Sequence, residues 1–186
     1  FFFHPHAANP DPLWSRGLGD VYKRQYYDPP NMTYPNGAYI CVMEIDVDTG
    51  VSEIKKVYAL DDCGTRINPM IIEGQVHGGL TEALAISMGQ EIAYDEQGNV
   101  MTGTLMDFFV PTAWETPNYE TDFTETPSPH HPIGAKGVGE SPNVGGVSAF
   151  SNAVHDAFKP FGLTQAHMPH DHWRVWKIAK DLGLHN

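Results

Sequence analysis

The residues best suited to chemistry lie in one glycine-rich stretch, 134–141, which reads Gly-Ala-Lys-Gly-Val-Gly-Glu-Ser. Glycine lets the backbone adopt positive φ angles and approach a ligand closely. The stretch holds one carboxylate, Glu140, and one cation, Lys136. A carboxylate in such a loop is a candidate acid or base. An apolar-periodic segment follows, which we expect to be a helix capped by Ser148, so free amide groups before it suit a polar or anionic ligand.

The spacing of these glycines excludes two phosphate-binding motifs. Lys136 is followed by Gly137 rather than by Ser or Thr, as a P-loop requires, and the pattern G-x-x-G-x-G differs from the dinucleotide-binding G-x-G-x-x-G. The residues alone leave two interpretations open. The stretch is a ligand-binding loop with Glu140 as acid or base, or it is a surface turn whose glutamate is merely solvated.

Charge and cysteine content narrow the class of protein. The 186 residues carry a formal charge of −12, with 23 acidic and 11 basic side chains, which argues against nucleic acid or an anionic membrane surface as a partner. No apolar run is long enough to span a bilayer. Cys41 and Cys63 form neither a disulfide framework nor a metal motif, and this fits a reducing, cytoplasmic setting.

The first 25 residues differ from the rest. The run 13–25 resembles translated sequencing-adaptor DNA, and the residues before it lack helical or strand periodicity. We therefore interpret 1–25 as non-native, adaptor-derived sequence or as a disordered arm, and leave it out of the fold prediction. The native portion is then 26–186.

Periodicity and turn residues predict the elements that position the glycine-rich stretch. Every second residue from 39 to 47 is apolar, and the residues between them are apolar only at 40 and 42. This predicts a strand that is buried on one face throughout and on both faces at its start. A turn follows at 48–50 and 51–60 returns, which predicts an antiparallel hairpin. Asn68 followed by Pro69 is a strong helix start, and the helix should run to about Met88.

The predicted helix contains Gly74, Gly78 and Gly79, which cost helix stability and therefore indicate that another backbone or a flat ligand lies close.

Less regular segments complete the chain. We expect a short second hairpin over 91–102, a strand at 104–110, a long loop over 111–132 and a last helix over 171–182. That helix should direct Trp173, Trp176 and Ala179 inward. The histidine pairs near 130 and 170 lack partner ligands at suitable spacing, so no metal site is predicted there. The whole is α+β, with antiparallel hairpins, helices packed on one side and long ordered loops, as a lobe of a larger domain.

The sequence then resembles a known family. KGVGE at 136–140, with the flanking TPSPHHPIGA and SPNVGG, is similar to the active-site loop of the molybdenum-binding large subunit of the xanthine dehydrogenase/aldehyde oxidase family. DDCGTRINPMIIEGQVHGGL at 61–80 resembles its cofactor-facing helix, and MPHDHWRVWK at 168–177 continues the likeness. The resemblance covers nearly all of 26–186, and its details are similar to the copper-containing carbon monoxide dehydrogenase branch.

The resemblance implies roles for individual residues. Glu140 would lie beside the molybdenum of a molybdopterin cytosine dinucleotide and act as the active-site base, in an enzyme that converts CO and water to CO2, two protons and two electrons. The residues implied to contact or line the cofactor are Gln75, Lys136, Gly137, Gly139 and Ser141.

One feature of that branch is missing from this chain. Its copper is held by a cysteine in an upstream loop, and neither Cys41 nor Cys63 matches that loop, so no metal ligand is assigned here. The chain is therefore expected to be an inactive C-terminal fragment. Two alternatives remain: a copper-free hydroxylase acting on an aldehyde or N-heterocycle, and a non-catalytic binding or interaction module.

The resemblance also implies partners and a location. The partners are the remainder of the large subunit, separate iron–sulfur and flavin subunits, and CO as a small-molecule substrate. The complete enzyme would be a dimer of heterotrimers. It would lie in the cytoplasm, associated in some cases with the inner face of the membrane.

Overall fold

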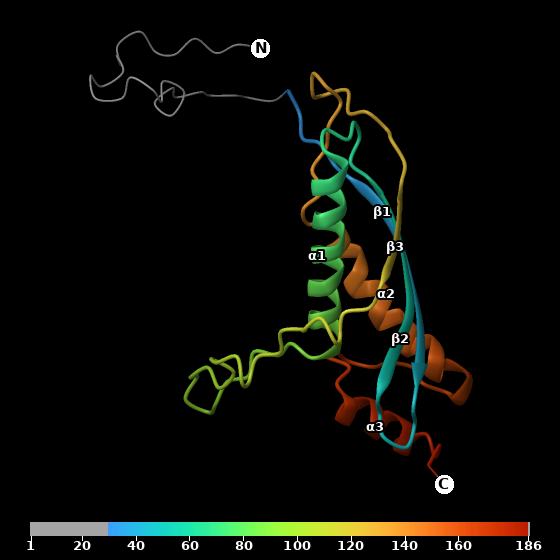
Figure 1. The fold of residues 1–186 in the computed structure, drawn as a ribbon. Helices are drawn as coiled ribbons and strands as arrows, with labels where there is room; N and C mark the ends of the chain where they lie inside the picture. The colour runs from blue at the N-terminus through green and yellow to red at the C-terminus, as the bar shows by residue number, and fades with distance from the viewer. Residues whose placement is uncertain (1–29, 186) are drawn as a thin grey trace. The chain divides into compact units, whose positions relative to one another are not determined.

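The computed structural model describes residues 30–185, and the interpretation of residues 1–25 lies outside them. Residues from Thr33 onward form the unit described below. Its elements are β1 (Asn36–Ile45), β2 (Ser52–Asp62), α1 (Pro69–Met88), β3 (Tyr119–Phe123), α2 (Ser141–Phe158), a short 3-10 turn η2 (Lys159–Phe161) and α3 (His172–Asp181). This is an α+β arrangement, as predicted (Figure 1).

The sheet consists of the predicted hairpin and one strand that was not predicted. β1 and β2 pair antiparallel, with Asn36 opposite Asp62 and a register shift between Val42 and Met43. β3 pairs parallel to β2, from Val57 opposite Tyr119 to Asp61 opposite Phe123. β3 lies within the segment that was expected to be loop. The expected strand at 104–110 is wrong, because that segment forms turns.

One face of the sheet carries the core. Val57 and Ala59 of β2 pack against the buried stripe of α1 and against Phe150 of α2, and both helices cover this face (Figure 1). Helix α1 begins as predicted, since the Asn68 side chain accepts a hydrogen bond from Ile71 N. The opposite face leaves Ile40 and other apolar side chains exposed, although the start of β1 was expected to be buried on both faces.

Helix α2 starts earlier than predicted, at Ser141 rather than after Ser148. Pro142 stands in its first turn, where a proline is well tolerated. Gly146 lies inside the helix, and a Cβ there would come to 2.8 Å from the Ala83 Cβ on α1. Glycine at this position therefore permits close helix packing rather than a flexible loop.

The end of the chain packs onto a second apolar cluster. Val175 and Ala179 of α3 are buried with Val154 and Phe158 of α2. Ala179 was predicted to point inward, whereas Trp173 was wrongly predicted to do so and is 65 % exposed.

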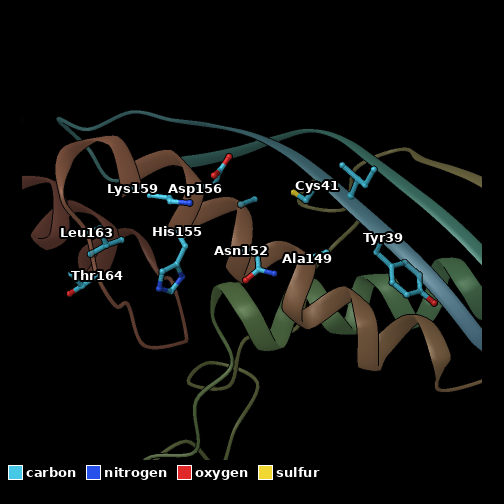
Figure 2. Close-up of a pocket in the computed structure, with 11 residues that line it drawn as sticks. Tyr39, Cys41, Ala149, Asn152, His155, Asp156, Lys159, Leu163 and Thr164 are labelled. Carbon is cyan, nitrogen blue, oxygen red and sulfur yellow. The ribbon is translucent and has the colours of Figure 1, made fainter.

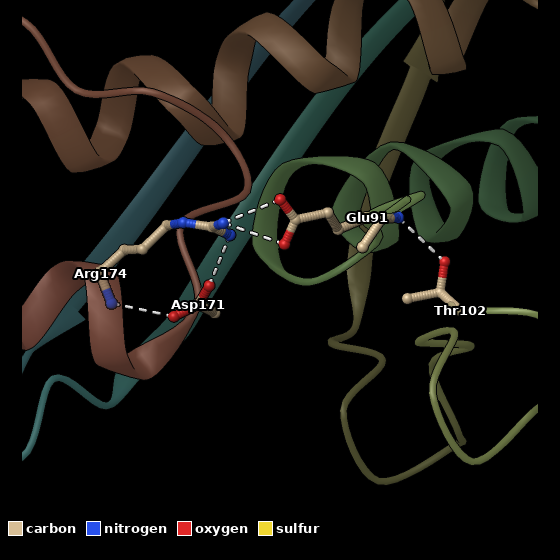
Figure 3. Close-up of polar contacts among 5 residues, drawn as sticks. Glu91, Thr102, Asp171 and Arg174 are labelled. Atoms are coloured by element: carbon tan, nitrogen blue, oxygen red, sulfur yellow. Dashed lines mark hydrogen bonds and ion pairs between the residues drawn. The ribbon is translucent and has the colours of Figure 1, made fainter. Parts of the chain in front are cut away.

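An ion pair fixes the start of α3. The Arg174 guanidinium contacts Glu91 at 2.9 Å and Asp171 at 2.7 Å (Figure 3). It thereby ties α3 to the segment that follows α1. The predicted second hairpin in that segment is reduced to one antiparallel bridge between Tyr94 and Val100.

In residues 30–185, no helix has the length and apolar character needed to cross a membrane.

Candidate functional site

The glycine-rich loop lies against the chain that leaves β2. Lys136 N donates to Cys63 O at 2.7 Å, and Thr65 N donates to Gly134 O at 3.3 Å. Gly64 and Gly134 both have positive φ, and a Cβ on Gly64 would overlap the Gly134 carbonyl oxygen. Glycine is therefore required where these two segments meet.

A buried ion pair holds the first part of the loop. Lys136 Nζ lies 2.8 Å from Asp62 Oδ1, and each side chain is only 6 % exposed. Asp62 also accepts hydrogen bonds from Gly64 N at 2.9 Å and Thr126 N at 3.1 Å. Burial alone would raise the pKa of Asp62, but the bonds from Lys136, Thr126 and Gly64 outweigh it and hold that pKa well below its usual range. The Lys136 ammonium, which was expected to face a cofactor, is thus paired inside the fold.

A second anchor holds the other end of the loop. Ser141 Oγ donates to Asp61 Oδ1 at 3.0 Å, and Tyr39 OH donates to the same oxygen at 2.5 Å. Asp61 is buried. Burial and then the Asp61 carboxylate raise the pKa of Tyr39 far above its usual value, so the phenol keeps the proton that it donates. Ser141, which was predicted to line a cofactor site, is bonded inward as well.

Glu140 differs from its neighbours. It is exposed and directly precedes α2, and its carboxylate has no hydrogen bond or ion pair with another described residue. Gly139 precedes it, and a Cβ at Gly139 would lie 3.2 Å from Gln75 Oε1. The structure therefore brings Gln75, Gly139 and Glu140 together on one exposed surface, although α1 and the loop are far apart in the sequence.

Exposed glycines lie on α1 and in the loop that carries Glu140. A Cβ at Gly74, Gly78 or Gly137 would meet no described atom within 4 Å. Asn143, in the first turn of α2, has a buried Oδ1 without a hydrogen-bond partner in the described part of the chain. An open backbone, a free carboxylate, a primary amide and an unpaired acceptor fit a polar cofactor with many hydrogen-bonding groups.

The described residues offer little to a metal ion directly. Among them no group of three or more His, Cys, Asp or Glu side chains is placed to hold one. Burial raises the pKa of the Cys41 thiol to about 11 and also raises that of Cys63. Both side chains therefore stay protonated near neutral pH, which disfavours a thiolate ligand.

The groove between β1 and α2 is separate from this surface. It encloses about 530 Å³ and is lined by residues such as Cys41, Asn152 and Lys159 (Figure 2). His155 in its wall accepts a hydrogen bond from Ala166 N at 2.9 Å, so its ring ties a loop to α2. None of the predicted site residues lines the groove.

Sequence reasoning missed Tyr39, Asp61 and Asp62, which hold the loop. Two consecutive aspartates at the end of an apolar strand were the available signal, because strand ends seldom bury two charges without a purpose. Their partners lie between 22 and 80 residues away along the chain, so the pairing could not be read locally.

Comparison with known proteins defines the class. Residues 12–117 match the family of molybdopterin cofactor-binding domains. The chain belongs to this family.

Two relatives and one solved structure refine the likeness. The chain is 68 % identical to the carbon monoxide dehydrogenase large chain of Afipia carboxidovorans over 177 residues, which is 95 % of this chain and 22 % of the relative. It is 35 % identical to the nicotine 6-hydroxylase large subunit of Paenarthrobacter nicotinovorans, over 84 % of this chain and 19 % of that subunit. A crystal structure of a Cu,Mo-CO dehydrogenase in its carbon monoxide reduced state superposes with a TM-score of 0.84 and 71 % identity, over 87 % of this chain and 20 % of the other.

The alignments cover nearly all of this chain but only part of each relative. The chain spans about a fifth of the length of the curated relatives that it matches. An alignment of 177 of the 186 residues necessarily includes the loop at 134–141. The predicted kinship with the xanthine dehydrogenase family, and within it with the carbon monoxide dehydrogenase large subunit, is confirmed.

Proposed function

We propose that this chain is part of the large subunit of a copper- and molybdenum-dependent enzyme that oxidises CO, with Glu140 as its active-site base. The observation that carries this proposal is the free Glu140 carboxylate beside Gln75 and the open glycines, in a chain 68 % identical to a carbon monoxide dehydrogenase large chain. The identity to a nicotine-hydroxylating relative is 35 %, which favours CO over an N-heterocycle as substrate.

The chemistry divides between this chain and its cofactor. A molybdopterin, in its cytosine dinucleotide form, would supply the two-electron redox chemistry when bound. The net reaction is CO plus H2O to CO2, two protons and two electrons. Glu140 would take up a proton from the attacking water, while Gln75 and the backbone at Gly137 and Gly139 would hold the cofactor. Lys136 and Ser141 would hold the glycine-rich loop in place from its buried side, through their contacts with Asp62 and Asp61.

The proposed assembly is larger than this chain. The exposed apolar face of the sheet, including Ile40 and Leu60, would be covered by the rest of the large subunit. Iron–sulfur and flavin subunits would take the two electrons, in a dimer of heterotrimers located in the cytoplasm, in some cases at the inner face of the membrane. We interpret 26–186 as the C-terminal portion of the molybdopterin-binding domain.

A turnover assay on the assembled enzyme tests the proposal. We expect CO-dependent reduction of an artificial electron acceptor, lost when copper is removed and restored when it is returned. Turnover of an aldehyde or N-heterocycle, independent of copper and without CO oxidation, would instead establish the copper-free hydroxylase. Sequencing the gene upstream of this segment adds a direct check, because the proposal requires a loop with the copper-binding cysteine.

The isolated chain provides a further prediction. It carries only a fraction of its relatives' length, so we expect far less than one molybdenum per purified 186-residue chain. Metal analysis by mass spectrometry measures this, and a full equivalent of molybdenum would show that the cofactor site is complete within these residues.

A further inference from the structure

Asp61 is a buried carboxylate whose two partners are both hydroxyl groups. It is 4 % exposed, and Tyr39 OH and Ser141 Oγ both donate to its Oδ1. Its other oxygen, Oδ2, is buried and has no hydrogen-bond partner in the described part of the chain. A buried oxygen without a hydrogen-bond partner destabilises the fold, so stability alone does not favour an aspartate here.

The adjacent Asp62 has the partners expected of a buried carboxylate that only stabilises the fold. Asp62 is neutralised by Lys136 and accepts two backbone amides in addition. Asp61 has no such cation among the described residues. Two hydroxyl donors on one oxygen fix the orientation of the carboxylate but do not neutralise its charge, because each O–H must point at the same atom.

The hydroxyl donor on the sheet is itself held rigidly. The ring of Tyr39 lies so close to Gly37 and Gly145 that a Cβ on either glycine would overlap it. Tyr39 is therefore fixed between its own strand and α2, and it holds Asp61 in one orientation.

Ser141 links the Asp61 carboxylate to the backbone of Glu140. It is the first residue of α2 and follows Glu140 directly, and the Glu140 carbonyl accepts a hydrogen bond from Val144 N at 3.0 Å. On the other side stands Gly139, which has no side chain to restrain the backbone. The Ser141–Asp61 bond is thus the side-chain contact nearest to Glu140 that ties this backbone to the sheet.

We propose that Asp61, supported by Tyr39, is a positioning residue for Glu140 and acts through the Ser141 hydroxyl. This inference rests on the proposed role of Glu140 as base. A catalytic group displaced by about 1 Å loses on the order of 100-fold in rate. Loss of the Ser141 hydroxyl should therefore reduce turnover while leaving substrate binding unchanged.

The first test compares serine variants in the full-length, assembled enzyme. We expect Ser141→Ala to lower kcat for CO oxidation about 10- to 100-fold, with KM and molybdenum content unchanged. Ser141→Thr keeps the hydroxyl and should recover most of the rate. Ser148→Ala is the matched control, since Ser148 is an exposed serine on the same helix, and it should behave as wild type. A Ser141→Ala enzyme that loses molybdenum in step with its activity would contradict the proposal.

A double-variant comparison separates this inference from the proposed function. If Ser141 acts through Glu140, adding Ser141→Ala to Glu140→Gln should lower kcat no further, and Asp61→Asn should show the same lack of additivity. Losses that multiply in the double variants would overturn the positioning role alone. A Glu140→Gln enzyme with full turnover would instead overturn the role of Glu140 itself.

Discussion

The buried and exposed sides of the glycine-rich loop differ in the side-chain contacts that they make with the rest of this chain. On the inner side the polar side chains of the loop are paired, Lys136 with Asp62 and Ser141 with Asp61, and both aspartates are buried at the end of β2. The outer side presents Glu140 and Gly137 with no side-chain partner among the described residues. Under the proposed function, the buried contacts of this chain support the site, and the exposed side of the loop would face the cofactor.

The largest stability effect is expected on the inner side, from Lys136→Met. This variant leaves Asp62 charged, buried and without its cation, which typically costs about 3–5 kcal/mol. Denaturant unfolding of the full-length subunit measures the loss. The double variant Asp62→Asn/Lys136→Met should recover much of it, because no unpaired charge remains. An unchanged unfolding midpoint for Lys136→Met would show that the pair does not hold the loop.

The same pair predicts a pH dependence of defined sign. The pKa of Asp62 is lowered in the folded state, so its stabilisation is present above the unfolded value of about 4 and is lost as pH falls through the folded-state pKa. The stability difference between wild type and Lys136→Met should therefore shrink below about pH 4. A difference that stays constant from neutral pH down to about pH 2 would contradict this assignment.

A smaller effect is expected where the loop meets the end of β2. Gly64→Ala combines a positive φ with an overlap against the Gly134 carbonyl, so we expect a loss of about 2–3 kcal/mol. Gly98→Ala is the matched control, because Gly98 also has positive φ but open space around it, and only about 1 kcal/mol should be lost. Equal losses in thermal unfolding of the two variants would show that the close approach is unimportant.

The smallest stability effect belongs to the outer side. Gln75 is exposed, so Gln75→Ala should change the free energy of unfolding by less than about 0.5 kcal/mol. Its effect should be on the cofactor, measured as reduced molybdenum content or slower turnover of the assembled enzyme. A loss of stability with the cofactor retained would place Gln75 in the support of the site instead.

The sequence was sufficient where the signal was local. Asn68 and Pro69 start α1 through contacts within one turn, and alternation alone predicts the hairpin. It was insufficient where distant segments decide. β3 forms because it pairs with β2 some sixty residues earlier, and position 146 of α2 accommodates glycine because Ala83 of α1 packs closely against it. The resemblance picked out Glu140 by its motif, whereas Asp61 emerges only when Tyr39 and Ser141 are seen around it.

The role of Glu140 is tested by Glu140→Gln in the full-length, assembled enzyme, with turnover, molybdenum content and unfolding measured on the same preparation. Glu96→Gln is the control, since it changes another exposed carboxylate in a distant turn. We expect Glu140→Gln to lower kcat by about 100-fold or more while metal content and stability stay at the wild-type level. Full turnover, or a loss explained entirely by missing molybdenum, would contradict the assignment of Glu140 as the active-site base.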